Sequence, residues 1–131
     1  GEYAKGYFCT PTLIADLPAE HHLWKQEMFV PITTIAAVRN LEEAMRLAND
    51  VQYGLTAGFY GTPEETEWFF ENIQAGVTYA NRPQGATTGA WPGYQPFGGW
   101  KGSGSSGKNA GGVHYLQLYM HEQIQTRVRR I

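Results

Sequence analysis

Between residues 31 and 80, hydrophobic and polar positions follow two alternating patterns. The segments 31–38, 55–60 and 77–80 carry no charge and are rich in β-branched and aromatic residues, which is typical of buried strands. In the two segments between them, apolar residues recur at the three- and four-residue spacing of an amphipathic helix. This strand–helix–strand–helix–strand order predicts parallel strands joined by right-handed crossovers, with the helices covering the sheet.

Both predicted helices open on a sequence signal for their first turn. Asn40 is followed three residues later by Glu43, so we expect a capping box and a helix that runs to about residue 48. Thr62 and Glu65 repeat this signal, with Pro63 at the first helical position, and predict a helix to about residue 73. The helices are therefore placed by their caps as well as by their apolar faces.

The flanking segments are less regular. Residues 6–14 predict an edge strand or extended arm because a proline interrupts them, residues 20–28 and 113–119 predict short helices, and residues 124–128 predict an exposed strand. Three parallel strands are few, because such sheets usually hold about five or six and need cover on both faces. We therefore expect an incomplete α/β domain, and the start at Gly1 rather than Met also suggests missing upstream sequence.

Residues 82–112 differ in character from the rest of the chain. They hold ten glycines and three prolines with almost no aliphatic side chains. A long segment without regular structure in a compact domain is usually either functional or disordered. Trp91, Phe97 and Trp100 favour an ordered loop, because large aromatic side chains are uncommon in linkers.

Composition and charge exclude several classes of protein. The 131 residues are 42% hydrophobic and 17% charged, which excludes a disordered chain. The net charge of -2 argues against nucleic acid or an anionic membrane as the main partner. No apolar run approaches the ~18–20 residues that cross a bilayer. A single cysteine cannot form an internal disulfide, so we expect a reducing cytoplasm.

Several short motifs imitate known sites without their context. Gly102–Gly107 fits the dinucleotide pattern G-x-G-x-x-G, but residues 96–101 cannot be the buried strand that must precede it. His121 and Glu122 begin a zinc motif that Gln125 fails to complete, so we expect no metal site. Cys9 has no nearby histidine or helix N-terminus to activate it, and we expect it to pack as a small apolar residue.

Four segments carry a more specific signal in combination. They are Gly6–Thr12 (GYFCTPT), Glu27–Pro31 (EMFVP), Asn49–Leu55 (NDVQYGL) and Pro96–Gly99 (PFGG). In this order and spacing, they resemble the C-terminal part of the aldehyde dehydrogenase superfamily over essentially the whole chain. The resemblance implies a three-layer fold with a mostly parallel sheet, of which this chain is an incomplete part.

A second pair of segments narrows the resemblance. Asn81–Gly89 (NRPQGATTG) followed by Gln95–Gly99 (QPFGG) is similar to the branch that oxidises glutamate γ-semialdehyde, the 1-pyrroline-5-carboxylate dehydrogenases. This implies oxidation of a small-molecule aldehyde to an acid with NAD or NADP. The family's nucleophilic cysteine, its glutamate base and its cofactor domain belong to motifs upstream of this region. We therefore expect this chain to need the remainder of the enzyme chain and to be inactive alone.

The resemblance also assigns roles to individual residues. Glu27 matches the glutamate that hydrogen-bonds the nicotinamide ribose, and Phe29 matches an aromatic beside the nicotinamide. Val30 stands where the family more often has glycine. Gly85 and Ala86 match the loop that anchors the α-carboxylate and amino group of the semialdehyde, where small side chains let a carboxylate reach backbone N–H groups.

Two further residues lie around that loop. Phe97 matches an aromatic that lines the aldehyde tunnel, where an apolar wall excludes water. Asn81 is expected to cap or brace the loop through its amide rather than to act in catalysis. For Glu27, Phe29 and Gly85 alike, a purely structural role is the alternative: a helix-end carboxylate, an aromatic packed in the core just before a strand, and a turn glycine.

The resemblance divides the chain into two parts. Residues 1–118 would belong to the catalytic domain, with the glycine-rich active-site loop at 82–112, and residues 119–131 would form an oligomerisation strand or tail. In that tail Ile124 and Val128 would share one face, so a homo-oligomer is expected. The alternative is a non-catalytic α/β module that binds a partner or assembles with itself.

Overall fold

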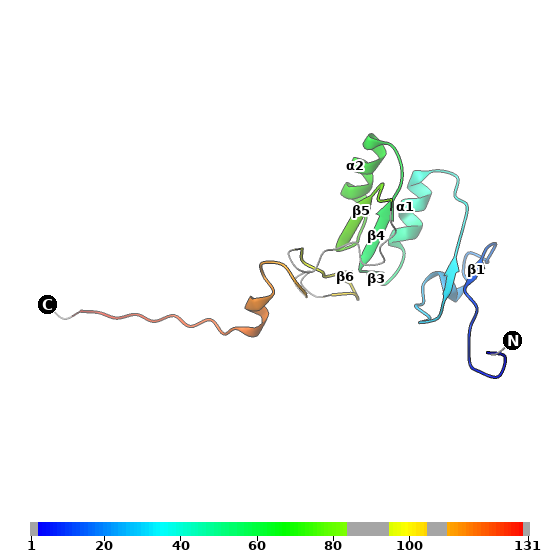
Figure 1. Ribbon diagram of the computed structural model, residues 1–131. Coiled ribbons are helices and arrows are strands. Elements are labelled where there is room, and N and C mark those ends of the chain that lie inside the picture. The colour runs from blue at the N-terminus through cyan, green and yellow to red at the C-terminus, as the bar shows by residue number, and fades with distance from the viewer. Residues whose placement is uncertain (1–2, 84–94, 105–109, 130–131) are drawn as a thin grey trace. The chain divides into compact units, whose positions relative to one another are not determined.

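The computed structural model describes residues 3–83, 95–104 and 110–129. The chain divides into two units, Gly1–Gln52 and Tyr53–Ile131. Figure 1 labels most of their helices and strands. In the described part of the chain, no helix combines the length and apolar character needed to cross a membrane. The expected division at residue 118 stays a prediction.

The first unit holds one small parallel sheet and two helices. Strand β1 (Thr12–Ile14) pairs in parallel with β2 (Ile32–Thr34), with Leu13 opposite Thr33. The 3₁₀-helix η1 (His22–Trp24) lies between these strands in the chain, and helix α1 (Leu41–Asn49) follows β2. The helix expected over 20–28 is therefore only one short turn, which ends because Lys25 leaves helical geometry at φ -122°.

The second unit is built around a strand–helix–strand motif. Strand β4 (Thr56–Phe59) pairs in parallel with β5 (Val77–Ala80), and helix α2 (Pro63–Asn72) connects them. Strand β3 (Tyr53–Gly54) pairs antiparallel with β6 (Trp100–Lys101), and the 3₁₀-helix η2 (Leu116–Tyr119) follows. The buried hydrophobic residues of the described chain all belong to this unit: Phe69, Ile73, Ala75 and Val77.

The pairing of the strands differs from the sequence-based expectation. We expected residues 31–38 to join 55–60 and 77–80 in one parallel sheet, but the described residues form three separate two-stranded sheets. Strand β2 takes β1 as its parallel partner, and the N–H groups of Thr12 and Ile35 extend this ladder to Pro31 and Ile14 at 2.9 Å. The three-layer arrangement stays a prediction.

Both helix caps form at the predicted residues. In α2, the Glu65 N–H donates to the Thr62 hydroxyl at 3.3 Å and the Thr62 N–H donates to the Glu65 carboxylate at 2.8 Å, which is a complete capping box. In α1, the Glu43 N–H donates to the Asn40 side chain at 2.9 Å. The Glu43 carboxylate instead accepts from Arg39, through its backbone N–H and its guanidinium, so this box is shifted by one residue.

The C-terminal tail is extended but unpaired within the described residues. Its apolar side chains are open to solvent, Ile124 with 87% and Val128 with 84% of its surface exposed. Gln125 donates to Gln123 at 2.9 Å, which places these alternate residues on one side, as in a strand. Figure 1 shows the tail as a coil, so the predicted oligomerisation strand stays a prediction that needs a partner chain.

We predict that Thr62→Ala lowers the free energy of unfolding by about 1 kcal/mol, because it removes the oxygen that caps the Glu65 N–H. Thr62→Ser keeps that oxygen and is the matched control. Urea unfolding of the protein that carries this sequence measures both variants. Equal losses for alanine and serine would show that the cap contributes nothing.

A second prediction concerns the titration of Glu43. The hydrogen bond from Arg39 holds the pKa of this carboxyl below its ordinary value of 4.5. A lowered pKa stabilises the folded state above the ordinary value, and that contribution is lost as the pH falls through the pKa of the folded protein. Carboxyl NMR titration should give a midpoint below 4.5, and Arg39→Ala should raise it; an unchanged midpoint in that variant contradicts the pairing.

Candidate functional site

The turn between η1 and β2 brings two of the predicted site residues together. Glu27 and Phe29 line the same cavity, which has a volume of about 520 Å³. The same cavity is lined by Leu23 from the 3₁₀-helix and by residues 32–34 of strand β2. The predicted nicotinamide-side pair therefore shares one hollow in the first unit.

Phe29 has an unusual backbone and an unusual exposure for a phenylalanine. Its φ is 51°, in the left-handed region that residues other than glycine rarely adopt. Its side chain is 90% exposed, so the expected packing before a strand does not occur within the described residues. Val30, where the family more often has glycine, does not have a positive φ, so a valine fits there without backbone strain. The turn thus presents an aromatic face outward.

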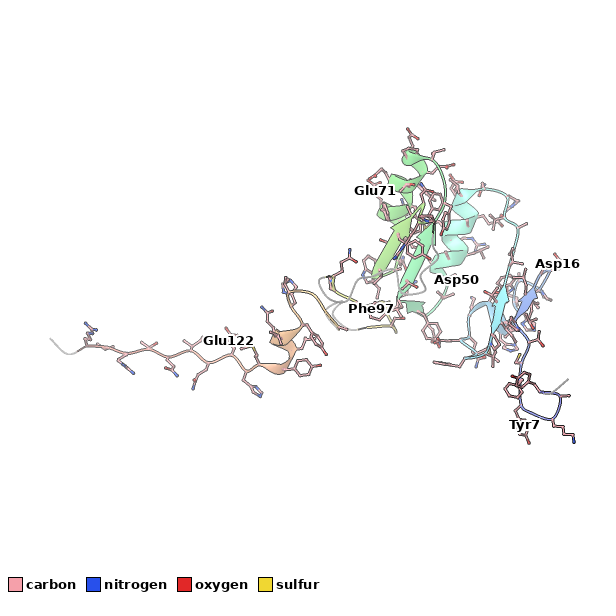
Figure 2. The ribbon with its side chains drawn as sticks, viewed as in Figure 1. Tyr7, Asp16, Asp50, Glu71, Phe97 and Glu122 are labelled. Carbon is pink, nitrogen blue, oxygen red and sulfur yellow. The ribbon has the colours of Figure 1, made fainter. Side chains whose placement is uncertain are left out.

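The nearby lysine does not pair with the Glu27 carboxylate, which is left able to bind a ligand. Lys25, two residues earlier, bonds Asp50 instead, with 2.8 Å between Nζ and Oδ2; Figure 2 labels Asp50. This hydrogen bond and the charge of Asp50 raise the pKa of Lys25, so the lysine stays protonated. Among the residues that the structure describes, no side chain pairs with Glu27. A free carboxylate of this kind can accept from two hydroxyl groups at once.

Phe97 belongs to the second unit, on the segment that leads into β6 (Figure 2). It is half-buried and forms a two-way bridge with Ala110, whose bonds are 2.7 and 3.1 Å long. Gly98 and Gly99 beside it are buried, and a Cβ on Gly76 would overlap the carbonyl oxygen of Gly98. Because the backbones approach this closely, the PFGG segment is held against the turn before β5.

A hydrogen bond from β3 fixes the other side of this segment. The Gly54 N–H donates to the Ser103 hydroxyl at 3.0 Å, although 49 residues separate them. A Cβ on Gly54 would meet the Gln74 carbonyl oxygen at 2.6 Å, which explains the glycine at this position. The YGL motif is therefore joined to the residues that directly follow PFGG, where Gly54 also pairs with Trp100.

The remaining sequence motifs have different outcomes. Gly85 and Ala86 lie outside the described residues, so their predicted substrate role stays a prediction. The strand before Gly102 is β6, which is two residues long, exposed and antiparallel, unlike the buried strand of a phosphate-binding loop. The expected packing of Cys9 is wrong: this thiol is exposed, because residues 5–11 form no ladder that could cover it.

Metal-ligand residues are likewise dispersed in the described part of the chain, where no three His, Cys, Asp or Glu side chains gather as a possible metal site. His21 and His22 stack on each other with centroids 4.6 Å apart, and Nδ1 of His21 accepts from the Leu23 N–H at 3.3 Å. This contact is a helix cap rather than a ligand position.

A cluster at the end of strand β5 extends what the sequence indicated. The Asn81 side chain exchanges two hydrogen bonds of 3.0 Å with the backbone of Gly61, as donor and as acceptor. The expected bracing role of its amide thus has a partner that sequence spacing alone does not reveal. The cluster lies at the carboxyl ends of the parallel strands β4 and β5, the edge where α/β proteins usually bind ligands.

Comparisons with known proteins agree on one group of enzymes. A curated relative from Bacillus thuringiensis, 1-pyrroline-5-carboxylate dehydrogenase, is 39% identical over 121 residues, which are 92% of this chain and 23% of the relative. The solved 1-pyrroline-5-carboxylate dehydrogenase from Thermus with bound NAD is 38% identical, with a TM-score of 0.78 over 88% of this chain and 22% of that one. Lactaldehyde dehydrogenase from Escherichia coli is 34% identical, with a TM-score of 0.76 over 91% and 24% of the two chains.

These matches cover most of this chain but only a small part of each relative. This chain spans less than a quarter of the length of the curated relatives that it matches. The sequence model of the aldehyde dehydrogenase family matches residues 1–124, which is nearly the whole chain. The two solved structures are similar to this chain in both sequence and fold. The chain therefore belongs to the aldehyde dehydrogenase family.

Proposed function

We propose that this chain forms part of an NAD(P)-dependent aldehyde dehydrogenase that oxidises glutamate γ-semialdehyde, the open form of 1-pyrroline-5-carboxylate, to glutamate. The observation that carries the proposal is the cavity that Glu27 and Phe29 share: a carboxylate with no side-chain partner among the described residues, and an exposed aromatic ring. The substrate is supported by relatives named 1-pyrroline-5-carboxylate dehydrogenase, together with the segment NRPQGATTG.

The resemblance to the family also suggests which catalytic groups this chain supplies and which it lacks. In this family a cysteine thiolate adds to the aldehyde, hydride leaves to the nicotinamide, and water activated by a glutamate releases the acid. We assign that cysteine and that glutamate, with the cofactor domain, to polypeptide upstream of Gly1. The chain alone would then be inactive, because it supplies only groups that position the reactants.

Glu27 and Phe29 are the proposed cofactor contacts. A carboxylate can accept hydrogen bonds from both hydroxyls of a ribose, and charge-assisted bonds of this kind are stronger than neutral ones. The Phe29 ring is exposed on its turn, so it can lie against a flat nicotinamide ring. The cofactor is NAD or NADP, and a similar structure with bound NAD supports a nicotinamide cofactor in general.

The other end of the substrate is assigned to the glycine-rich loop. Gly85 and Ala86 are proposed to hold the α-carboxylate and amino group through backbone groups. Phe97 is proposed to form an apolar wall of the aldehyde tunnel, and its bridge to Ala110 holds the backbone that carries the ring. In this proposal the loop recognises the α-amino acid end of the substrate, and Phe97 lines the path of its aldehyde end.

The setting of the enzyme is also part of the proposal. The extended tail, with Ile124 and Val128 exposed, has open backbone groups that suit a neighbouring subunit, so we propose a homo-oligomer. The single cysteine and near-neutral charge support a cytoplasmic enzyme with neither nucleic-acid nor membrane partners.

The proposal predicts turnover by the full protein that carries this sequence. With glutamate γ-semialdehyde and NAD or NADP, the absorbance of the reduced nicotinamide should rise, and glutamate should form in equal amount. The residues 1–131 alone should give no turnover under the same conditions. A full protein that assembles but oxidises no aldehyde would contradict the enzyme and favour a non-catalytic module.

We predict that Glu27→Gln lowers kcat/KM by about 10- to 100-fold, because it weakens charge-assisted bonds to the ribose. The effect should fall on turnover and on the binding of the cofactor, measured by fluorescence titration, and should leave the KM of the aldehyde nearly unchanged. Glu42→Gln, at an exposed carboxylate in the first turn of α1, is the matched control. Unchanged kinetics in Glu27→Gln would refute the role of this residue.

A further inference from the structure

The chain turns sharply where it leaves strand β5. The Asn81 N–H donates to the Phe59 carbonyl at 2.8 Å, which is the last bond of the parallel ladder. Asn81 itself has a φ of 50°, in the left-handed region that asparagine tolerates better than most residues. This one residue therefore ends the ladder and sets the direction of the segment that follows it.

The side chain of Asn81 ties this turn to the neighbouring strand. Its Nδ2 donates to the Gly61 carbonyl and its Oδ1 accepts from the Gly61 N–H, both at 3.0 Å. Gly61 comes two residues after the end of β4, and Asn81 directly follows β5. The two hydrogen bonds thus join the carboxyl ends of both strands as a reciprocal amide clamp.

The other half of the clamp is itself rigidly placed. Gly61 directly precedes the capping box of α2, in which Glu65 accepts from the Thr62 N–H at 2.8 Å. A Cβ on Gly61 would meet the Phe59 ring at 2.6 Å and the Glu65 carboxylate at 2.7 Å, so this backbone lies close to both side chains. The Phe59 ring in turn stacks on buried Phe69, which connects the clamp to the core.

A second contact holds the residue after the clamp. The Tyr60 hydroxyl donates to the Arg82 carbonyl at 2.8 Å. The Arg82 guanidinium lies over the ring of Tyr79, 5.9 Å from its centroid, at the edge of cation–π range. The first residue beyond Asn81 is therefore held by the side chain that follows β4 and by one from β5.

We propose that Asn81 is a positioning residue for substrate recognition: its clamp on Gly61, supported by Tyr60 on Arg82, fixes the direction in which the chain leaves β5. Gly85 and Ala86 follow in the sequence and lie outside the described residues. The inference rests on the proposed function, in which those two residues receive the α-amino acid end of the semialdehyde. Asn81 touches neither substrate nor cofactor in this proposal. It acts through the backbone that it orients, because misplacement of a binding group by about 1 Å is enough to weaken a site.

Asn81 could direct the chain through its positive φ or through the hydrogen bonds of its side-chain amide, and substitutions separate these two contributions. Asn81→Gly keeps the freedom to adopt a positive φ but lacks the amide, so it tests the clamp without backbone strain. Asn81→Asp keeps the acceptor for the Gly61 N–H and loses the donor to its carbonyl. If only the φ mattered, the glycine variant would behave as the wild type.

The test measures steady-state kinetics of the full protein with two aldehydes. For Asn81→Gly we expect the KM of glutamate γ-semialdehyde to rise about tenfold, as the loss of two modest hydrogen bonds would give. The KM of propanal, which lacks the α-amino acid end, and the Kd of the cofactor should stay unchanged. Asn81→Asp should fall between wild type and glycine. An unchanged KM, or equal losses for both aldehydes, overturns the proposal.

The matched control is Asn72→Ala. The Asn72 amide donates to the Trp68 carbonyl at 2.7 Å near the end of α2, and we expect this variant to keep wild-type kinetics. Tyr60→Phe tests the second contact and should raise the same KM by a smaller factor. A loss in Asn72→Ala as large as that in Asn81→Gly would show that any asparagine in this unit matters equally, and would contradict a specific clamp.

Hydrogen exchange distinguishes failure of the clamp from failure of the proposed function. In Asn81→Gly the amide of Gly61 should exchange at least about tenfold faster than in wild type or Asn72→Ala, since it loses its acceptor. This readout needs no activity. If the full protein does not oxidise the semialdehyde, the proposed function and the substrate role of the clamp both fail. Unchanged exchange at Gly61 overturns the clamp itself.

Discussion

Burial of Phe69 against the β4–β5 ladder is the interaction on which the second unit depends. Its side chain is only 4% exposed, and its ring stacks on that of Phe59 at 5.1 Å between centroids. Removing one such side chain from water contributes about 1.5–3 kcal/mol, a large share in a unit with so few buried residues. Helix α2 is therefore held on the parallel strands by this contact, and the strand ends keep their relative register. This contact therefore also fixes the carboxyl ends of β4 and β5, where the glycine-rich loop begins.

The described residues of the first unit include no buried hydrophobic side chain. Leu13 is 65% exposed and Phe29 is 90% exposed, and all the buried hydrophobic residues of the described chain belong to the second unit. Large hydrophobic side chains with this much exposed surface are suited to contact with further polypeptide or a ligand. This supports the proposal that the chain works within a larger dehydrogenase, where the cavity of Glu27 and Phe29 would face a cofactor.

Local signals predicted local structure well. The strand over 77–80 has its predicted bounds, and the caps at Asn40 and Thr62 form because each depends on residues within one helical turn. The partner of strand β2 could not be predicted in the same way, since pairing is a choice among distant segments that periodicity does not rank. The short helix expected over 20–28 failed because its spacing says nothing about where the turn stops.

The residues of the candidate site likewise divide into those indicated by sequence motifs and those that depend on contacts between distant segments. Glu27 and Phe97 are predicted site residues only through a resemblance in motifs, because an exposed carboxylate and a half-buried ring carry no distinctive local pattern. The contact between Asn81 and Gly61 spans 20 residues and requires the parallel pairing of β4 with β5 before it can exist. Gly61 is also next to the cap of α2, so one turn serves both the stability of the helix and the direction of the loop. A change in that turn should therefore alter stability and recognition together, which is why the test of Asn81 compares two substrates rather than one.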